Sequence, residues 1–206
     1  MSSISKLEGP SPNNAASTAE TSGEPPSLRR LNTTRAYPQL LSYEEIPEWC
    51  KDNKYILHGY RSVSGSARAS LYSWFYMHNE SMNIYTHLFP AIASLVGLGS
   101  FLHYLHSEYP NITALQDFIF VFFFLTAAGC LLLSTMYHTL CNHSIEVDAL
   151  WLRMDFGGIV LLTLGAFVSG IYMIFWCEPV QRKVYWSMVC TLRQTSYLIT
   201  TSHLLA

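Results

Sequence analysis

The chain has 206 residues and a formal net charge of −2 at pH 7; 50% of its residues are hydrophobic and only 13% are charged. Soluble domains usually carry about 25% charged residues, so this composition argues against a soluble globular protein. The near-neutral charge, with no basic patch beyond one region near the first apolar stretch, argues against a nucleic-acid partner. None of the five cysteines forms a CxxC pair, which argues against a disulfide framework or a thiolate zinc site.

The chain begins with polar, irregular sequence. Residues 1–36 are rich in Ser, Thr, Asn, Pro and Gly without apolar periodicity, so we expect a disordered cytosolic tail. Residues 37–79 mix aromatic and aliphatic side chains with charges, which indicates a cytosolic juxtamembrane segment. Near its end, apolar residues recur at i, i+3, i+4 and i+7: Leu71, Trp74, Phe75 and His78. This spacing predicts an amphipathic helix in the headgroup layer.

Three long stretches then contain no Asp, Glu, Lys or Arg: 81–107, 118–145 and 156–177. Each exceeds the roughly 20 residues that a helix needs to cross a hydrocarbon core. We therefore predict an all-α, polytopic membrane helix bundle over 80–206. Its expected spans are 83–105, 118–140 and 156–176, with a partial fourth span over 184–206. The fourth is partial because Arg193 interrupts it, and a charge at mid-span costs about 2.5–3.5 kcal/mol.

The distribution of basic residues predicts the orientation of the spans. Four of them precede the first span closely: Lys51, Lys54, Arg61 and Arg68. The first connection, 106–117, contains none. Because Lys and Arg favour cytosolic loops, we expect the N-terminus in the cytosol.

Polar residues gather at the ends of the predicted spans. They form three groups, one for each span: Glu80, Asn83 and His87; Ser134 and His138; and Asp155. Offsets of 0, 3 and 7 place the first group on one helical face. Because neighbouring spans are antiparallel, all three groups fall on the cytosolic side at one depth. The sequence therefore predicts one shared polar site.

Metal binding is the chemistry that suits such a site. His138 could bind zinc as a neutral imidazole, and a carboxylate could bind directly or through water. Zinc lowers the pKa of a bound water to about 7, and Asp155 could accept the released proton. The same side chains could instead be hydrogen-bonded within a helix bundle. A catalytic zinc normally has three protein ligands. Beyond His138, the further candidates are His87 and His103, and His103 is discounted because we expect it at the opposite face.

Several motifs resemble those of the progestin and adiponectin Q receptors, a family that includes haemolysin III-like proteins and fungal zinc-homeostasis regulators. They are Glu80-Ser-Met-Asn83-Ile-Tyr-Thr86-His87, Ser134-Thr-Met-Tyr-His138 and Met154-Asp155-Phe-Gly-Gly158. The adiponectin-receptor branch is most similar, through the entry segment over 45–61 and through Cys177-x-Pro179.

The resemblance implies a seven-helix fold with a cytosolic N-terminus and a zinc ion near the cytosolic leaflet. It assigns His138 as a zinc ligand, Asp155 as the holder of a zinc-bound water and Ser134 as its support. Glu80, Asn83 and His87 would surround them. The family's other two zinc histidines belong to an H-x-x-x-H in the last helix, which this sequence lacks. We therefore expect a C-terminally truncated member that ends around its fourth helix.

The resemblance also implies a role in lipid and zinc homeostasis signalling. Two alternatives stay open: a zinc-dependent hydrolase of a lipid amide such as ceramide, and an inactive fragment that lacks two zinc histidines. The implied partners are membrane lipid and a lipid or extracellular protein ligand. The implied location is the plasma membrane or the endoplasmic reticulum.

Overall fold

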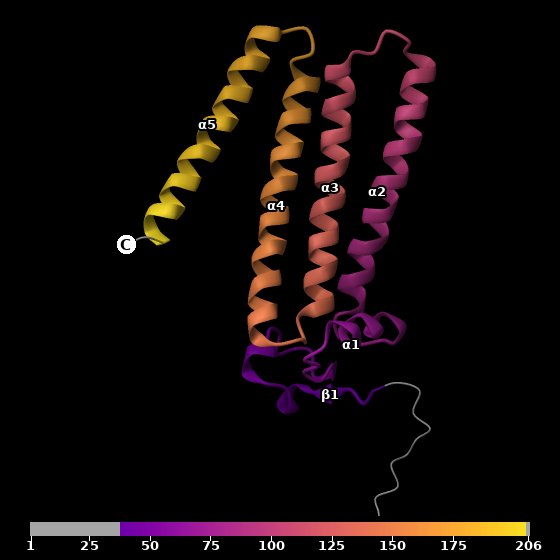
Figure 1. The fold of residues 1–206 in the computed structure, drawn as a ribbon, viewed down its shortest axis with the longest axis vertical. Helices are drawn as coiled ribbons and strands as arrows, with labels where there is room; N and C mark the ends of the chain where they lie inside the picture. The colour runs from indigo at the N-terminus through magenta and orange to yellow at the C-terminus, as the bar shows by residue number, and fades with distance from the viewer. Residues whose placement is uncertain (1–37, 205–206) are drawn as a thin grey trace, which may run out of the picture. The chain divides into compact units, whose positions relative to one another are not determined.

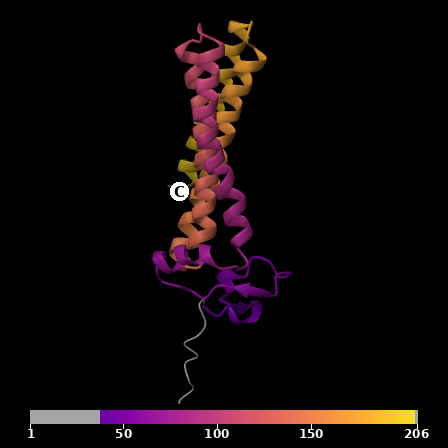
Figure 2. The same cartoon turned by 90° about the vertical axis from the view of Figure 1, so that its right-hand side faces the viewer.

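The computed structural model describes residues 38–204, with side chains described as far as residue 191. The tail expected over 1–36 lies outside the described residues. Four long helices follow one another in the chain: α2 (Ser81–Glu108), α3 (Ala114–Leu140), α4 (Ile145–Ile174) and α5 (Pro179–Leu204). Helices α2, α3 and α4 lie side by side, with α3 in the middle (Figures 1 and 2).

Close packing between α3 and α4 depends on glycine. A Cβ atom built at Gly165 would lie 2.0 Å from Oγ1 of Thr126, and one at Gly158 would lie 3.1 Å from Cα of Cys130. The Thr126 side chain therefore occupies the space beside Gly165, and the backbones of α3 and α4 approach closely at Gly158. The two glycines are seven residues apart, which keeps both on the face of α4 that meets α3.

Helices α2, α3 and α4 are the described helices that are long and apolar enough to cross a membrane. They contain 28, 27 and 30 residues, which at 1.5 Å per residue gives about 40–45 Å. That length equals a bilayer with its headgroup layers, about 40–45 Å. The chain is thus an all-α polytopic membrane protein, as predicted.

The helix ends differ from the predicted spans for local reasons. Helix α4 begins at Ile145 rather than near 156, because Ser144 accepts a hydrogen bond from Val147 N as its N-cap and acidic residues occupy its first turn. The predicted span comes from a stretch without charged residues. It therefore leaves out the acidic residues of the first turn, although such residues stabilise a helix N-terminus. Helix α5 continues through Arg193, since a charge interrupts an apolar run without breaking a helical backbone.

The described part of the juxtamembrane segment, residues 38–79, folds into short elements. Strand β1 (Leu41–Ser42) pairs antiparallel with β2 (His58–Tyr60), and two 3₁₀ helices lie between them, η1 (Tyr43–Glu45) and η2 (Glu48–Cys50). Helix α1 (Ala67–Tyr72) and the 3₁₀ helix η3 (Ser73–Phe75) follow. Gly59 adopts φ +92°, a conformation that favours glycine. The β1–β2 ribbon was not predicted from the sequence.

The predicted amphipathic face is divided in the structure. The helical conformation ends at Phe75, and the next residue, Tyr76, is extended. Leu71 and Phe75 are exposed, whereas His78 is buried and the Trp74 indole donates a 2.8 Å hydrogen bond to Oγ1 of Thr139. The prediction of one continuous face over 71–78 was wrong, because the chain leaves the helix before His78.

Candidate functional site

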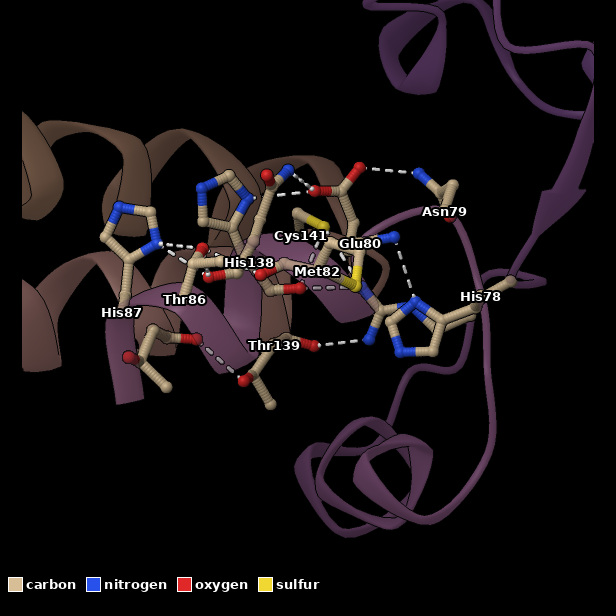
Figure 3. A network of polar contacts seen from close by, with 12 residues as sticks. His78, Asn79, Glu80, Met82, Thr86, His87, His138, Thr139 and Cys141 are labelled. Carbon is tan, nitrogen blue, oxygen red and sulfur yellow. Dashed lines mark hydrogen bonds and ion pairs between the residues drawn. The ribbon is translucent and has the colours of Figure 1, made fainter. Parts of the chain in front are cut away.

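A polar cluster lies where the juxtamembrane segment meets the ends of α2 and α3 (Figure 3). Its centre is the Glu80 carboxylate, whose Oε2 atom lies 2.9 Å from Nδ1 of His138. The same carboxylate accepts hydrogen bonds from the amides of Asn83, at 2.7 Å, and Asn79, at 2.5 Å. The Glu80 carboxylate therefore joins the start of α2 to His138, which lies 58 positions later in the chain.

The start of α2 holds Glu80 in place through its backbone. Glu80 is the N-cap residue of α2, and its amide donates to Nδ1 of His78 at 3.1 Å. The hydroxyl of Ser81 accepts from the His78 amide at 2.9 Å. These local bonds satisfy groups at the helix start that have no partner within the helix. They also fix the direction in which the Glu80 side chain leaves the helix.

The environment of the cluster determines its protonation. Burial raises the pKa of Glu80, but hydrogen bonds from His138 and Asn83 outweigh burial and hold the pKa below its usual value. Burial lowers the pKa of His78 to about 4, with the Arg61 charge adding to the effect. At neutral pH, Glu80 is therefore a carboxylate and His78 is a neutral imidazole.

The charge on Glu80 decides the tautomer of His138. An ionised carboxylate only accepts hydrogen bonds, so Nδ1 of His138 must carry the proton. The Nε2 atom of a neutral His138 then has a free lone pair, and it makes no hydrogen bond with any described residue. A carboxylate that orients a histidine in this way is the arrangement found behind metal-binding histidines.

His87 lies beside His138 and is oriented in the same way. The two ring centroids are 5.7 Å apart. The Nδ1 atom of His87 lies 2.6 Å from the backbone carbonyl of Asn83, and a carbonyl can only accept, so Nδ1 is again the donor. Two neighbouring imidazoles therefore both keep Nε2 available as a ligand atom.

The remaining candidate residues are not bonded to this cluster. Ser134 is buried on α3, one turn before His138, and Asp155 is half-buried on α4, ten residues after its first residue, Ile145. Neither side chain forms a hydrogen bond or ion pair within the part of the chain whose side chains are described. The structure thus joins Glu80, Asn83 and His138, with His87 alongside, and leaves Ser134 and Asp155 without a polar partner there.

The donor atoms present supply part of a zinc site. Among the described residues, no three or more His, Cys, Asp or Glu side chains are placed to hold one metal ion. Burial raises the pKa of Cys50 to about 11 and that of Cys141 to about 12, so both nearby thiols are protonated at neutral pH and are poor ligands. The imidazoles of His138 and His87 remain the best donors.

The sequence did not predict a role for Arg61 in the site; its charge was used only to predict the orientation of the spans. Its guanidinium is buried and donates to the carbonyl oxygens of His138, at 2.7 Å, and Thr139, at 2.9 Å, and to the Ser73 hydroxyl at 2.8 Å. Carbonyls in the last turn of a helix have no partner within it, and a cation is favoured there. Arg61 therefore fixes the end of α3 through its backbone carbonyls, whereas Glu80 contacts the His138 ring. A lone arginine ahead of a serine-rich stretch gives no hint of a target 77 positions away.

Three membrane-spanning helices and a polar cluster at one end of them define a polytopic helical membrane protein with a polar site at its helix ends. Residues 75–205 match the Haemolysin-III related family, and the chain belongs to that family.

Several relatives in other organisms are similar to the chain. It is 34% identical over 157 residues to "Adiponectin receptor protein" of Drosophila melanogaster, covering 76% of this chain and 35% of that protein. It is 35% identical over 158 residues to "ADIPOR-like receptor IZH2" of Saccharomyces cerevisiae, covering 74% and 47%. "Heptahelical transmembrane protein 1" of Arabidopsis thaliana is 35% identical over 148 residues, covering 68% and 43%. The chain therefore spans less than half the length of these three relatives.

Proposed function

We propose that this chain is an adiponectin-receptor-like membrane protein with a zinc site near the cytosolic leaflet, acting in lipid and zinc homeostasis signalling. The observation that carries the proposal is the 2.9 Å contact between Glu80 and Nδ1 of His138, which leaves Nε2 as the ligand atom. The names of two relatives, an adiponectin receptor and an ADIPOR-like receptor, support the receptor part.

The residues take distinct roles in this proposal. His138 is the zinc ligand, and Glu80 orients it and compensates part of the metal's positive charge. Asn83 donates a 2.7 Å hydrogen bond to Oε2 of Glu80, the same oxygen that contacts His138, and so holds the carboxylate in place. Ser134 and Asp155 support the site from α3 and α4, with Asp155 as the group that accepts a proton. A bound zinc would supply Lewis acidity.

The proposed orientation places this site in the cytosolic half of the membrane. Basic residues are abundant before α2, for example Lys51 and Lys54, and absent from the connection between α2 and α3 over 109–113. The opposite ends of the helices would then face an extracellular or lumenal ligand, which is either a lipid or a protein.

The test is the zinc content of the purified chain. Wild type, His138→Ala and His103→Ala are purified in detergent and measured by elemental analysis. His103 is an exposed histidine near the other end of α2, so it serves as the matched control. We expect zinc in the wild type and in His103→Ala, and its loss in His138→Ala. Equal zinc in all three variants would contradict the role of His138, and zinc in none would favour the inactive fragment.

A further inference from the structure

The segment that leads into α2 has its polar side inside and its apolar side outside. We call residues 67–77 the elbow; it comprises α1, η3 and the two residues that follow. Ser70 and Ser73 are 0% exposed. The large apolar side chains are the exposed ones: Leu71 at 41%, Tyr72 at 47%, Phe75 at 71% and Met77 at 64%. A segment surrounded by water would show the reverse pattern.

The inner side of the elbow is fully occupied by hydrogen bonds. The Ser70 hydroxyl donates to Oδ1 of Asn142 at 2.8 Å, and the Ser73 hydroxyl donates to the Ser70 carbonyl at 2.7 Å while accepting from Arg61. These bonds determine which side faces the helix bundle. The elbow therefore cannot turn its apolar side inward without breaking them.

The elbow also lies at the level of the membrane helices, not beyond them. The hydroxyl of Tyr85, in the second turn of α2, donates to the backbone carbonyl of Trp74. The Trp74 indole donates to Thr139, the penultimate residue of α3. Figure 1 shows α1 lying across the end of α2. Because the spanning helices are long enough to include the headgroup layers, their last turns lie in that layer.

We propose that the elbow is an interfacial membrane anchor, with Tyr72, Phe75 and Met77 inserted at the boundary between lipid headgroups and acyl chains. Lipid is the chosen occupant because the elbow is bonded to α2 through Tyr85, and exposed apolar residues of α2 lie on both sides of Tyr85 in the sequence, Met82 at 61% and Phe89 at 62%. Interfacial helices bury their apolar side chains at this boundary. The anchor does not depend on zinc binding.

This anchor connects the leaflet to the polar cluster. Ser73 sits between two exposed apolar residues, Tyr72 and Phe75, and accepts the Arg61 guanidinium that also binds the His138 carbonyl. Lipid contact on the outer side thus stabilises the side chain that fixes the end of α3.

The test is photo-crosslinking to lipid in phosphatidylcholine nanodiscs. The photoreactive residue p-benzoylphenylalanine replaces Phe75 or Met77, one variant at a time. Leu57, 60% exposed and outside the elbow, is the negative control, and Phe89 on α2 is the positive control. All four positions are exposed, so the label is accommodated without repacking. Adducts are identified by mass spectrometry of the intact chain and its peptides.

We expect lipid adducts at 75 and 77 at a yield similar to that at 89, and roughly tenfold above that at 57. Adducts at 75 and 77 no more abundant than at 57 would overturn the proposal. Crosslinks from these positions to a second protein copy would overturn it too, because protein would then cover the surface. The zinc assay is independent of either result, so failure of one proposal leaves the other standing.

Discussion

Helices α3 and α4 carry the two residues given the main roles in the predicted site, and these two residues are held very differently. His138 on α3 is bonded from two sides, by Glu80 at its ring and by Arg61 at its carbonyl. Asp155 on α4 has no hydrogen bond or ion pair within the described side chains. The difference shows that two residues predicted at one depth in the membrane need not be equally organised. One half of the site is rigidly arranged by this chain, and the other half is only positioned by its helix.

The largest test of this comparison removes the buried cation. Arg61→Met should leave two helix-end carbonyls and the Ser73 hydroxyl without their donor, and lower the free energy of unfolding by about 3 kcal/mol. The measurement is thermal or denaturant unfolding in detergent. Arg68→Met is the control, because Arg68 is exposed; a similar loss in both variants would show that Arg61 has no special role.

The second test uses acid. Because the pKa of His78 is about 4 when folded and about 6.5 when unfolded, the unfolded chain binds the proton first as the pH falls. Stability should therefore decrease between about pH 6.5 and pH 4, by on the order of 2 kcal/mol. The measurement is unfolding as a function of pH for wild type and His78→Asn. An equally steep decrease in His78→Asn would assign the effect to other groups.

The third test addresses the proposed zinc site through its orienting carboxylate. Glu80→Gln keeps the shape but removes the charge that fixes the proton on Nδ1 of His138, so zinc affinity should fall by about tenfold. Competitive titration with a zinc-binding dye measures this change. Glu108→Gln, at the other end of α2, should leave the affinity unchanged.

The smallest expected effect on the free energy of unfolding comes from a substitution at Asp155. Asp155→Asn should change the free energy of unfolding by less than about 0.5 kcal/mol, because no hydrogen bond or ion pair is lost. The unfolding assay used for Arg61→Met measures it directly. A loss comparable to that of Arg61→Met would mean that Asp155 has a bonded partner and that the contrast between His138 and Asp155 is false.

The sequence predicted the membrane helices well, because the length of an apolar stretch follows directly from bilayer thickness. It also placed Glu80, Asn83 and His138 at one depth, which the structure joins by hydrogen bonds. Helical periodicity placed Glu80 and Asn83 on one face of α2. The antiparallel order of the spans then placed His138 on α3 at the same side of the membrane.

The contacts of the juxtamembrane segment could not be predicted in this way. Trp74 and His78 fit an apolar helical face, yet both have polar partners: the Trp74 indole donates to Thr139 on α3, and the His78 ring accepts from the Glu80 amide. The target of Arg61 is a pair of backbone carbonyls, and backbone groups carry no sequence signature. Only the three-dimensional position of a helix end reveals that it needs a donor.

The bond between Arg61 and the end of α3 has a consequence for how the protein is made. Its acceptors lie 77 and 78 residues later in the chain, so the bond has no partner until those residues have been synthesised. At 5–20 residues per second, that interval is roughly 4–15 s. During this time the Arg61 guanidinium lacks its two carbonyl acceptors on α3, although Ser73, 12 residues later, is already in the chain. Assembly of the polar cluster is therefore a late event of biosynthesis, completed only when the second spanning helix has entered the membrane.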